Sequence, residues 1–206
     1  MNKTLTSLVA SLVLSSATSV FAASSVDLTV KGLITPSACT PSLSGGGVID
    51  HGKISSKDLQ ADKSTLIGTH ILILTVNCDA AILMAVHSID NRLGSSPLPS
   101  GFGLGWINGT QELGWYQLAL LNPIADNVAV GTILSSDGGE TWVDDNYWDR
   151  GLYMSVAAVT DASQPVAIKD LTVDLRVQTV IARTDGLDLS NEVPIDGSAT
   201  LEVKYL

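Results

Sequence analysis

Residues that could bind a sugar or a cation are concentrated between Trp142 and Asp149, where aromatic side chains are interspersed with carboxylates. Exposed aromatic rings stack on sugars, and carboxylates accept sugar hydroxyl groups or bind Ca²⁺. A glycan contact in this stretch would use Trp142, Tyr147 and Trp148. The stretch lacks the Asp-x-Asp-x-Asp-Gly pattern and the closing Glu of a calcium loop, so we expect no metal site. The favoured interpretation is a long hairpin whose aromatic residues pack at its base.

Groups that could perform catalysis form no recognisable motif. The histidines His51, His70 and His87 are scattered along the chain, and no serine lies in a Gly-x-Ser-x-Gly elbow. No nucleophile, base and orienting residue can be assigned together. We therefore expect neither enzymatic activity nor a cofactor.

The N-terminal residues predict export. Lys3 provides a positive start, an apolar stretch runs from Leu5 to Leu14, and Val20-Phe21-Ala22 precedes the expected cleavage site. The apolar stretch is too short, and too interrupted by serine, to anchor the chain across a bilayer. We expect residues 1–22 to be a signal peptide and the exported protein to be soluble, without direct membrane insertion.

Two cysteines, Cys39 and Cys78, are present in the chain. In an exported protein such a pair is expected to form a disulfide. The closed loop would stabilise the fold by about 4 kcal/mol in the chain-entropy model. A free thiol pair and a metal site are the alternatives, and both are disfavoured because the spacing contains no Cys-x-x-Cys.

The charge balance limits the classes of partner. The formal net charge is −10 and the pI is about 4.4, which argues against nucleic acid as a ligand. Apolar residues make up 45% of the chain and charged residues 16%. This is an apolar composition for a secreted monomer, and it suggests that some surface is meant for another protein.

Apolar and polar residues alternate in several segments, which predicts half-buried strands. No segment has a persuasive helical period, and the Gly- and Ser-rich stretches 91–110 and 135–150 are expected as loops that account for the chain's length. These features predict an all-β sandwich over residues 39–206. The interior strands are expected to bury Leu72, Leu74, Val76, Cys78, Leu171, Val173, Leu175, Val177, Thr179 and Ile181.

The two ends of the exported chain show the same alternation. The leader begins close to the expected cleavage site, and its apolar face contains Val26, Leu28, Val30, Gly32 and Ile34. The C-terminal strand places Ala199, Leu201, Val203 and Tyr205 on one face.

Together these ends resemble those of pilins, the structural subunits of chaperone–usher fimbriae in Gram-negative bacteria. The shared features are an alternating leader ending in Gly32-Leu33-Ile34 before the first cysteine, a second cysteine at the end of the second strand, and an alternating C-terminal strand with an aromatic residue, Tyr205, at its penultimate position. Phe102-Gly103-Leu104-Gly105 and residues 196–201 are similar to a less characterised, fimbrial-like branch of exported proteins.

The resemblance implies an incomplete immunoglobulin-like sandwich that lacks its last strand. A periplasmic chaperone would supply that strand first, and the leader of the next subunit would then replace it by donor-strand complementation. Residues 23–38 would form the donor segment, Gly32 would occupy a shallow pocket, and the C-terminal strand would border the groove. The protein would be a structural subunit that passes through the periplasm to a surface fimbria and supports adhesion. Its partners would be neighbouring subunits, the chaperone and an outer-membrane usher.

Three alternatives remain open. The leader could be an ordinary first strand of a self-contained sandwich. The protein could be a secreted carbohydrate-binding β-sandwich module that uses the aromatic stretch. A secreted hydrolase is the weakest of the three, because no catalytic group of residues is evident.

Overall fold

The computed structural model describes residues 28–32 and 38–206. The chain divides into two units, Met1–Ile34 and Thr35–Leu206. The expected signal peptide, together with Val26 and Ile34 of the expected donor strand, lies outside the described residues. In the first unit, residues 28–32 belong to no helix or strand, and their side chains are exposed.

The second unit is built almost entirely of strands. They are β1 (Cys39–Leu43), β2 (Thr65–Ile82), β3 (Met84–Asp90), β4 (Phe102–Gly103), β5 (Trp106–Ile107), β6 (Gln111–Glu112), β7 (Gly114–Ala125), β8 (Val128–Ala129), β9 (Gly131–Ser135), β10 (Val143–Asp144), β11 (Tyr147–Trp148), β12 (Tyr153–Ala157), β13 (Ile168–Ile181) and β14 (Ala199–Tyr205). Short 3-10 turns lie at Ser44–Gly47, Ser56–Asp58 and Thr184–Gly186.

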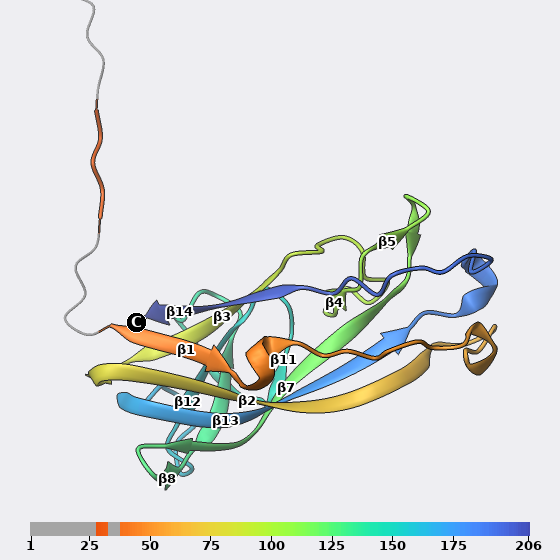
Figure 1. Cartoon of the computed structure of the whole chain (residues 1–206). Helices are drawn as coiled ribbons and strands as arrows, with labels where there is room; N and C mark the ends of the chain where they lie inside the picture. The colour runs from red at the N-terminus through yellow and green to blue at the C-terminus, as the bar shows by residue number, and fades with distance from the viewer. Residues whose placement is uncertain (1–27, 33–37) are drawn as a thin grey trace, which may run out of the picture. The chain divides into compact units, whose positions relative to one another are not determined.

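Two antiparallel sheets form the sandwich (Figure 1). The first has the order β1-β2-β13-β7-β11, with β4 and β8 also paired to β7, and the second has the order β10-β9-β12-β3-β14. Strands β5 and β6 form a separate hairpin. The predicted all-β sandwich is confirmed.

The long strands β2 and β13 form the centre of the first sheet. Because side chains alternate between the faces of a strand, their apolar residues point into the space between the sheets. Val76 and Val173 are both 0% exposed, which confirms the predicted inward face of each strand. Leu72 of that face is only half-buried.

The disulfide between Cys39 and Cys78 is confirmed. The two residues lie directly opposite each other in the β1–β2 ladder, with their Cα atoms 4.0 Å apart. The bridge therefore fastens the edge strand β1 to the centre of the first sheet.

Part of the expected loop at 91–110 contributes to the core. Phe102 and Leu104 are 0% and 3% exposed, and the Phe102 ring stacks on Tyr116 with 5.0 Å between ring centroids. A Cβ at Gly103 would collide with Ser95 Oγ and would lie 2.6 Å from the carbonyl oxygen of Arg92, so glycine lets this strand lie close against residues 92–95. Arg92 also forms an ion pair with Asp196, which ties this segment to the residues before β14.

None of the helices within the described residues has the length and apolar character needed to cross a membrane.

Candidate functional site

One side of the sandwich lies between β1 and β14, which are edge strands of the two sheets. Within the described residues, β1 pairs only with β2 and β14 pairs only with β3. Each strand therefore has one edge whose backbone groups are not used in a ladder. At one end the two edges are joined, because the backbone N–H of Cys39 donates a hydrogen bond to Tyr205 Oη at 3.0 Å.

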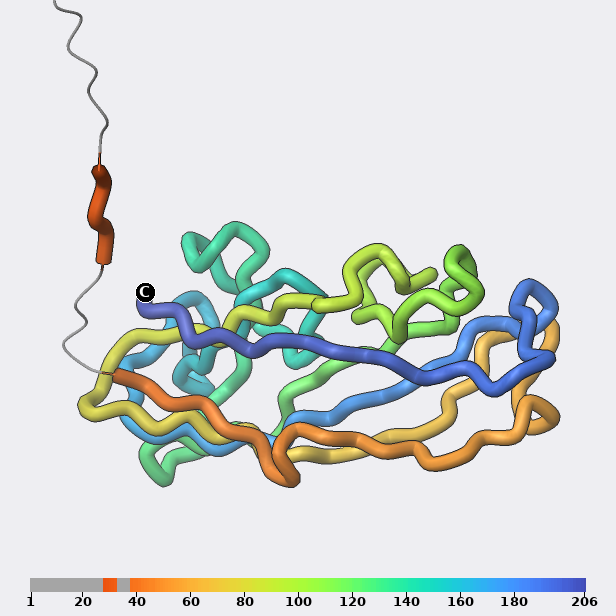
Figure 2. The backbone as a smooth tube through the Cα atoms, turned by 45° about the horizontal axis from the view of Figure 1, so that its top comes forward, coloured from red at the N-terminus to blue at the C-terminus, as the bar shows by residue number. Residues whose placement is uncertain are grey.

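Beyond β1 and before β14 the chain continues without regular structure along the same side. Residues 48–55 form one wall and residues 192–198 the other, and no strand is assigned in either. Figure 2 shows the two segments, orange and dark blue, running along the length of the sandwich. The backbone N–H groups of Ile49, His51 and Val193 donate no hydrogen bond to any described residue. Such free donors are what an added strand requires.

A narrow cavity of about 260 Å³ lies between the walls near β14. Its floor is formed by side chains of the first sheet, among them Leu118 and Leu175, which are 4% and 2% exposed. Leu43 of β1 and Leu201 of β14 line its sides and remain half-buried. This part of the groove is therefore apolar and incompletely covered.

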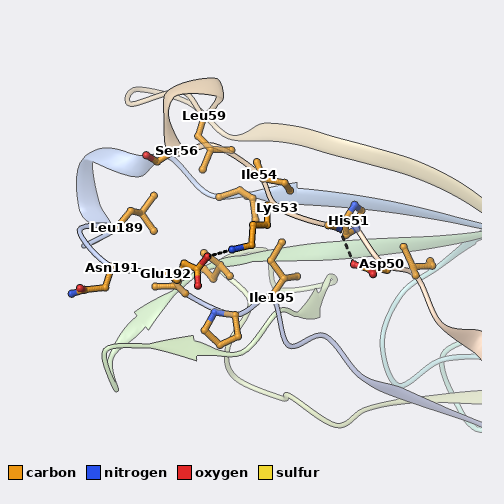
Figure 3. A pocket seen from close by; sticks show the side chains of 16 residues that line it. Asp50, His51, Lys53, Ile54, Ser56, Leu59, Leu189, Asn191, Glu192 and Ile195 are labelled. Atoms are coloured by element: carbon orange, nitrogen blue, oxygen red, sulfur yellow. Dashed lines mark hydrogen bonds and ion pairs between the residues drawn. The ribbon is translucent and has the colours of Figure 1, made fainter.

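A wider cavity of about 710 Å³ continues from the first toward the far end of the sandwich. Ile49, His51 and Ile195 line both cavities, so the two form one continuous groove. Figure 3 shows the wider part, with Lys53 and Glu192 meeting from opposite walls. Lys53 Nζ lies 2.7 Å from Glu192 Oε1, in an ion pair whose two side chains are 90% and 86% exposed. This part of the groove is mixed in polarity, with Leu59 and Leu189 beside the charged pair.

His51 is the polar group at the junction of the two cavities. Its Nε2 lies 3.0 Å from the Oγ1 atom of Thr179. Thr179 belongs to β13 and is 3% exposed. Burial lowers the pKa of His51, the neighbouring His70 lowers it further, and Asp50 acts in the opposite direction. The neutral imidazole is therefore favoured in the folded protein.

The predicted groove residues of the C-terminal strand occupy this site. Ala199 and Leu201 line the narrow cavity, and Val203 packs against the core from the same face of β14. Tyr205 is 36% exposed, and its hydroxyl accepts the hydrogen bond that closes one end of the groove. In the leader, Leu28 and Val30 are 89% and 86% exposed, and Gly32 is exposed as well.

The aromatic residues expected to contact a glycan do not share one surface. Trp148 is 1% exposed and donates its indole N–H to the carbonyl oxygen of Leu152, so it belongs to the core, which corrects its expected role. Trp142 is half-buried and donates to the carbonyl oxygen of Gly139. Tyr147 is 51% exposed, with the guanidinium of Arg176 5.4 Å from its ring centroid. One exposed ring remains where three were expected.

No sequence pattern indicates the wall that faces β14. His51 is one of three scattered histidines, and Lys53 and Glu192 are separated by 139 positions. No local spacing brings such residues together, so only the fold reveals them. Among the described residues, no group of three or more His, Cys, Asp and Glu side chains is arranged to hold a metal ion.

Comparison with known proteins finds similarities to one family model and to two bacterial proteins. A family model described as "Protein of unknown function (DUF1120)" matches residues 28–114, from the leader to the start of β7. The chain is similar to Protein GltF of Escherichia coli (strain K12), at 27% identity over 228 residues, covering 87% of this chain and 88% of GltF. It is also similar to the Uncharacterized protein YhcF of the same strain, at 26% identity over 222 residues, covering 90% of this chain and 92% of YhcF. Both similarities extend over most of each protein.

Proposed function

We propose that the protein is a non-enzymatic structural subunit of a surface fimbria that assembles by exchange of strands. The observation that carries this proposal is the open groove between β1 and β14, with free backbone edges and half-buried apolar walls. An unpaired edge beside an apolar core promotes aggregation unless another strand covers it. Addition of a strand from another chain would satisfy both the backbone groups and the apolar side chains.

The length and alternation of the leader support the proposal. The alternating segment from Val26 to Ile34 has nine residues, as has the stretch from Ile195 to Val203. In an extended strand with a rise of ~3.3 Å per residue, nine residues would span about 26 Å. The leader presents an apolar side chain at every second position except Gly32, and these would lie against the floor formed by Leu118 and Leu175.

The proposed assembly involves three kinds of partner. A periplasmic chaperone would occupy the groove after export, an outer-membrane usher would receive the complex, and the leader of a neighbouring subunit would then replace the chaperone strand. The protein would thus pass through the periplasm and end at the cell surface.

Deletion of residues 23–34 tests the proposal. The signal peptide is retained, and the variant is produced in the periplasm together with a candidate chaperone and usher. The shortened subunit should still co-purify with the chaperone, because its own groove is intact. It should fail to attach to the groove of a further subunit, as measured by the ladder of polymers on gels of unheated samples. Polymers as long as those of the unaltered protein would overturn the proposal.

A single substitution provides a finer test. Gly32→Leu adds a bulky side chain to the donor face and should reduce polymer formation, because overfilling a packed site is unfavourable. Lys31→Gln, on the opposite face of the same leader, is the matched control and should polymerise normally. Equal polymer formation by the two variants would contradict the assignment of the donor face.

A further inference from the structure

His51 occupies a position in the groove that no other ionisable group shares among the described residues. It lines both the narrow and the wide cavity, so a strand lying along the whole groove would pass over it. Its Nε2 is already paired with the hydroxyl of Thr179 in the floor. The imidazole is therefore fixed at the point where the apolar half of the groove becomes polar.

The surroundings of His51 disfavour a positive charge. From β2, the ring of His70 approaches at 5.0 Å between centroids in an edge-to-face arrangement. Gly68 leaves room for both rings, because a Cβ there would lie 2.9 Å from His51 Cε1 and 3.0 Å from His70 Nε2. The remaining charged groups nearby are Asp50, on the same wall, and the Lys53–Glu192 pair, whose charges compensate each other.

An inserted strand would remove the water that still reaches His51. The neutral imidazole would lose little, since one nitrogen keeps its partner Thr179. The charged form would lose hydration beside His70, and a buried charge without a counter-charge is costly. Occupation of the groove should therefore oppose protonation, and by linkage protonation should oppose occupation.

We propose that His51 makes strand binding in the groove dependent on pH, with the groove accepting a strand at neutral pH and releasing it under mildly acidic conditions. This regulation rests on the proposed function of the groove as the acceptor of a donor strand. It goes beyond that function because it assigns the control of strand binding to one side chain of the groove, which the donor strand does not supply.

Binding of a leader peptide to the mature full-length protein tests the proposal. The peptide comprises residues 23–34, is acetylated and amidated, and carries a fluorophore for anisotropy measurements. With blocked ends, none of its groups titrates between pH 5 and pH 7.5. The dissociation constant should be several-fold higher at pH 5 than at pH 7.5, because a further lowering of the His51 pKa by about one unit on binding can raise the dissociation constant by at most about tenfold.

Two variants identify the responsible group. His51→Gln keeps a hydrogen-bonding side chain for Thr179 but cannot be protonated, so it should bind the peptide equally at both pH values. His87→Gln, on β3 of the other sheet and outside the groove lining, should retain the full difference. Far-UV circular dichroism of each protein at both pH values verifies that the fold is retained.

The outcomes separate this inference from the proposed function. If the peptide binds neither at neutral pH nor at pH 5, the strand-accepting function itself is overturned. Binding that is equal at both pH values in the unaltered protein would overturn only the pH dependence. A pH dependence that persists in His51→Gln would show that another group is responsible.

Discussion

Removal of the disulfide between Cys39 and Cys78 should lower the free energy of unfolding by about 4 kcal/mol. The two cysteines are separated by 39 positions, and they face each other across the β1–β2 ladder. In the chain-entropy model, closing a loop of this size removes about 13 cal/mol/K from the unfolded ensemble, which gives the same figure at 25 °C. Single domains are commonly stable by only 5–15 kcal/mol, roughly, so the loss would be a large fraction of the total.

The assay is urea unfolding of the double variant Cys39→Ala/Cys78→Ala, followed by circular dichroism and compared with the oxidised protein. Alanine is preferred to serine because Cys78 is 5% exposed and a hydroxyl there would need a partner. The unaltered protein treated with reductant should show a similar loss without any change of side-chain volume. A loss below about 1 kcal/mol in both samples would refute the argument, because a bridge that constrains the unfolded chain this little contributes almost nothing by entropy.

Three further predictions concern packing and pH. Trp148→Ala should lower the free energy of unfolding by about 3–5 kcal/mol in a thermal or urea titration. Tyr147→Ala, on the same short strand but 51% exposed, should change the free energy of unfolding by about 1 kcal/mol or less. Similar losses in both variants would contradict the assignment of Trp148 to the core. Gly103→Ala should cost about 1–3 kcal/mol because its Cβ would lie 2.6 Å from a carbonyl oxygen, while Gly131→Ala, with its nearest atom at 3.9 Å, should be nearly neutral; the reverse order would disprove the close-approach argument. Folding lowers the pKa of His51 below 6.5, so the unfolded chain binds more protons than the folded protein below that pH. The free energy of unfolding should therefore fall as the pH drops through 6.5, and His51→Gln should reduce this decline. If urea titrations at several pH values show the same decline in the variant, another group causes it.

The sheets themselves were predictable because alternation is a local property of a strand. Every second residue of β2 and β13 faces the same side, so runs such as Leu74-x-Val76 and Val173-x-Leu175 indicate their buried face without knowledge of the partner strand. The disulfide was predictable for a related reason, since two cysteines in an exported chain have few alternatives to pairing.

The composition of the aromatic segment 142–149 suggested exposed rings, but one of its aromatic side chains is buried in the core. Trp148 stands among acidic residues that suggest a surface, yet its pairing with Leu118 in the β11–β7 ladder directs the indole into the core. Likewise, the glycines around Phe102 suggest a loop, yet Phe102 is 0% exposed and its ring stacks on Tyr116 of β7. In both segments the deciding contact comes from a distant strand.

Alternation alone could not predict the groove, because it reveals the faces of a strand but not its edges; the groove was expected only from the resemblance to pilins. Leu43 and Leu201 alternate with polar residues in the same way as fully buried core residues, yet both remain half-buried, as does Leu72 of β2, where β1 and β14 diverge. The chain therefore carries more core-facing side chains than its own described strands cover. Since such side chains gain stability only when water is removed from them, a strand added along β14 would be stabilised by surfaces that the fold already directs inward. The alternation that specifies the core of this protein thus also produces the half-buried apolar surface beside β14.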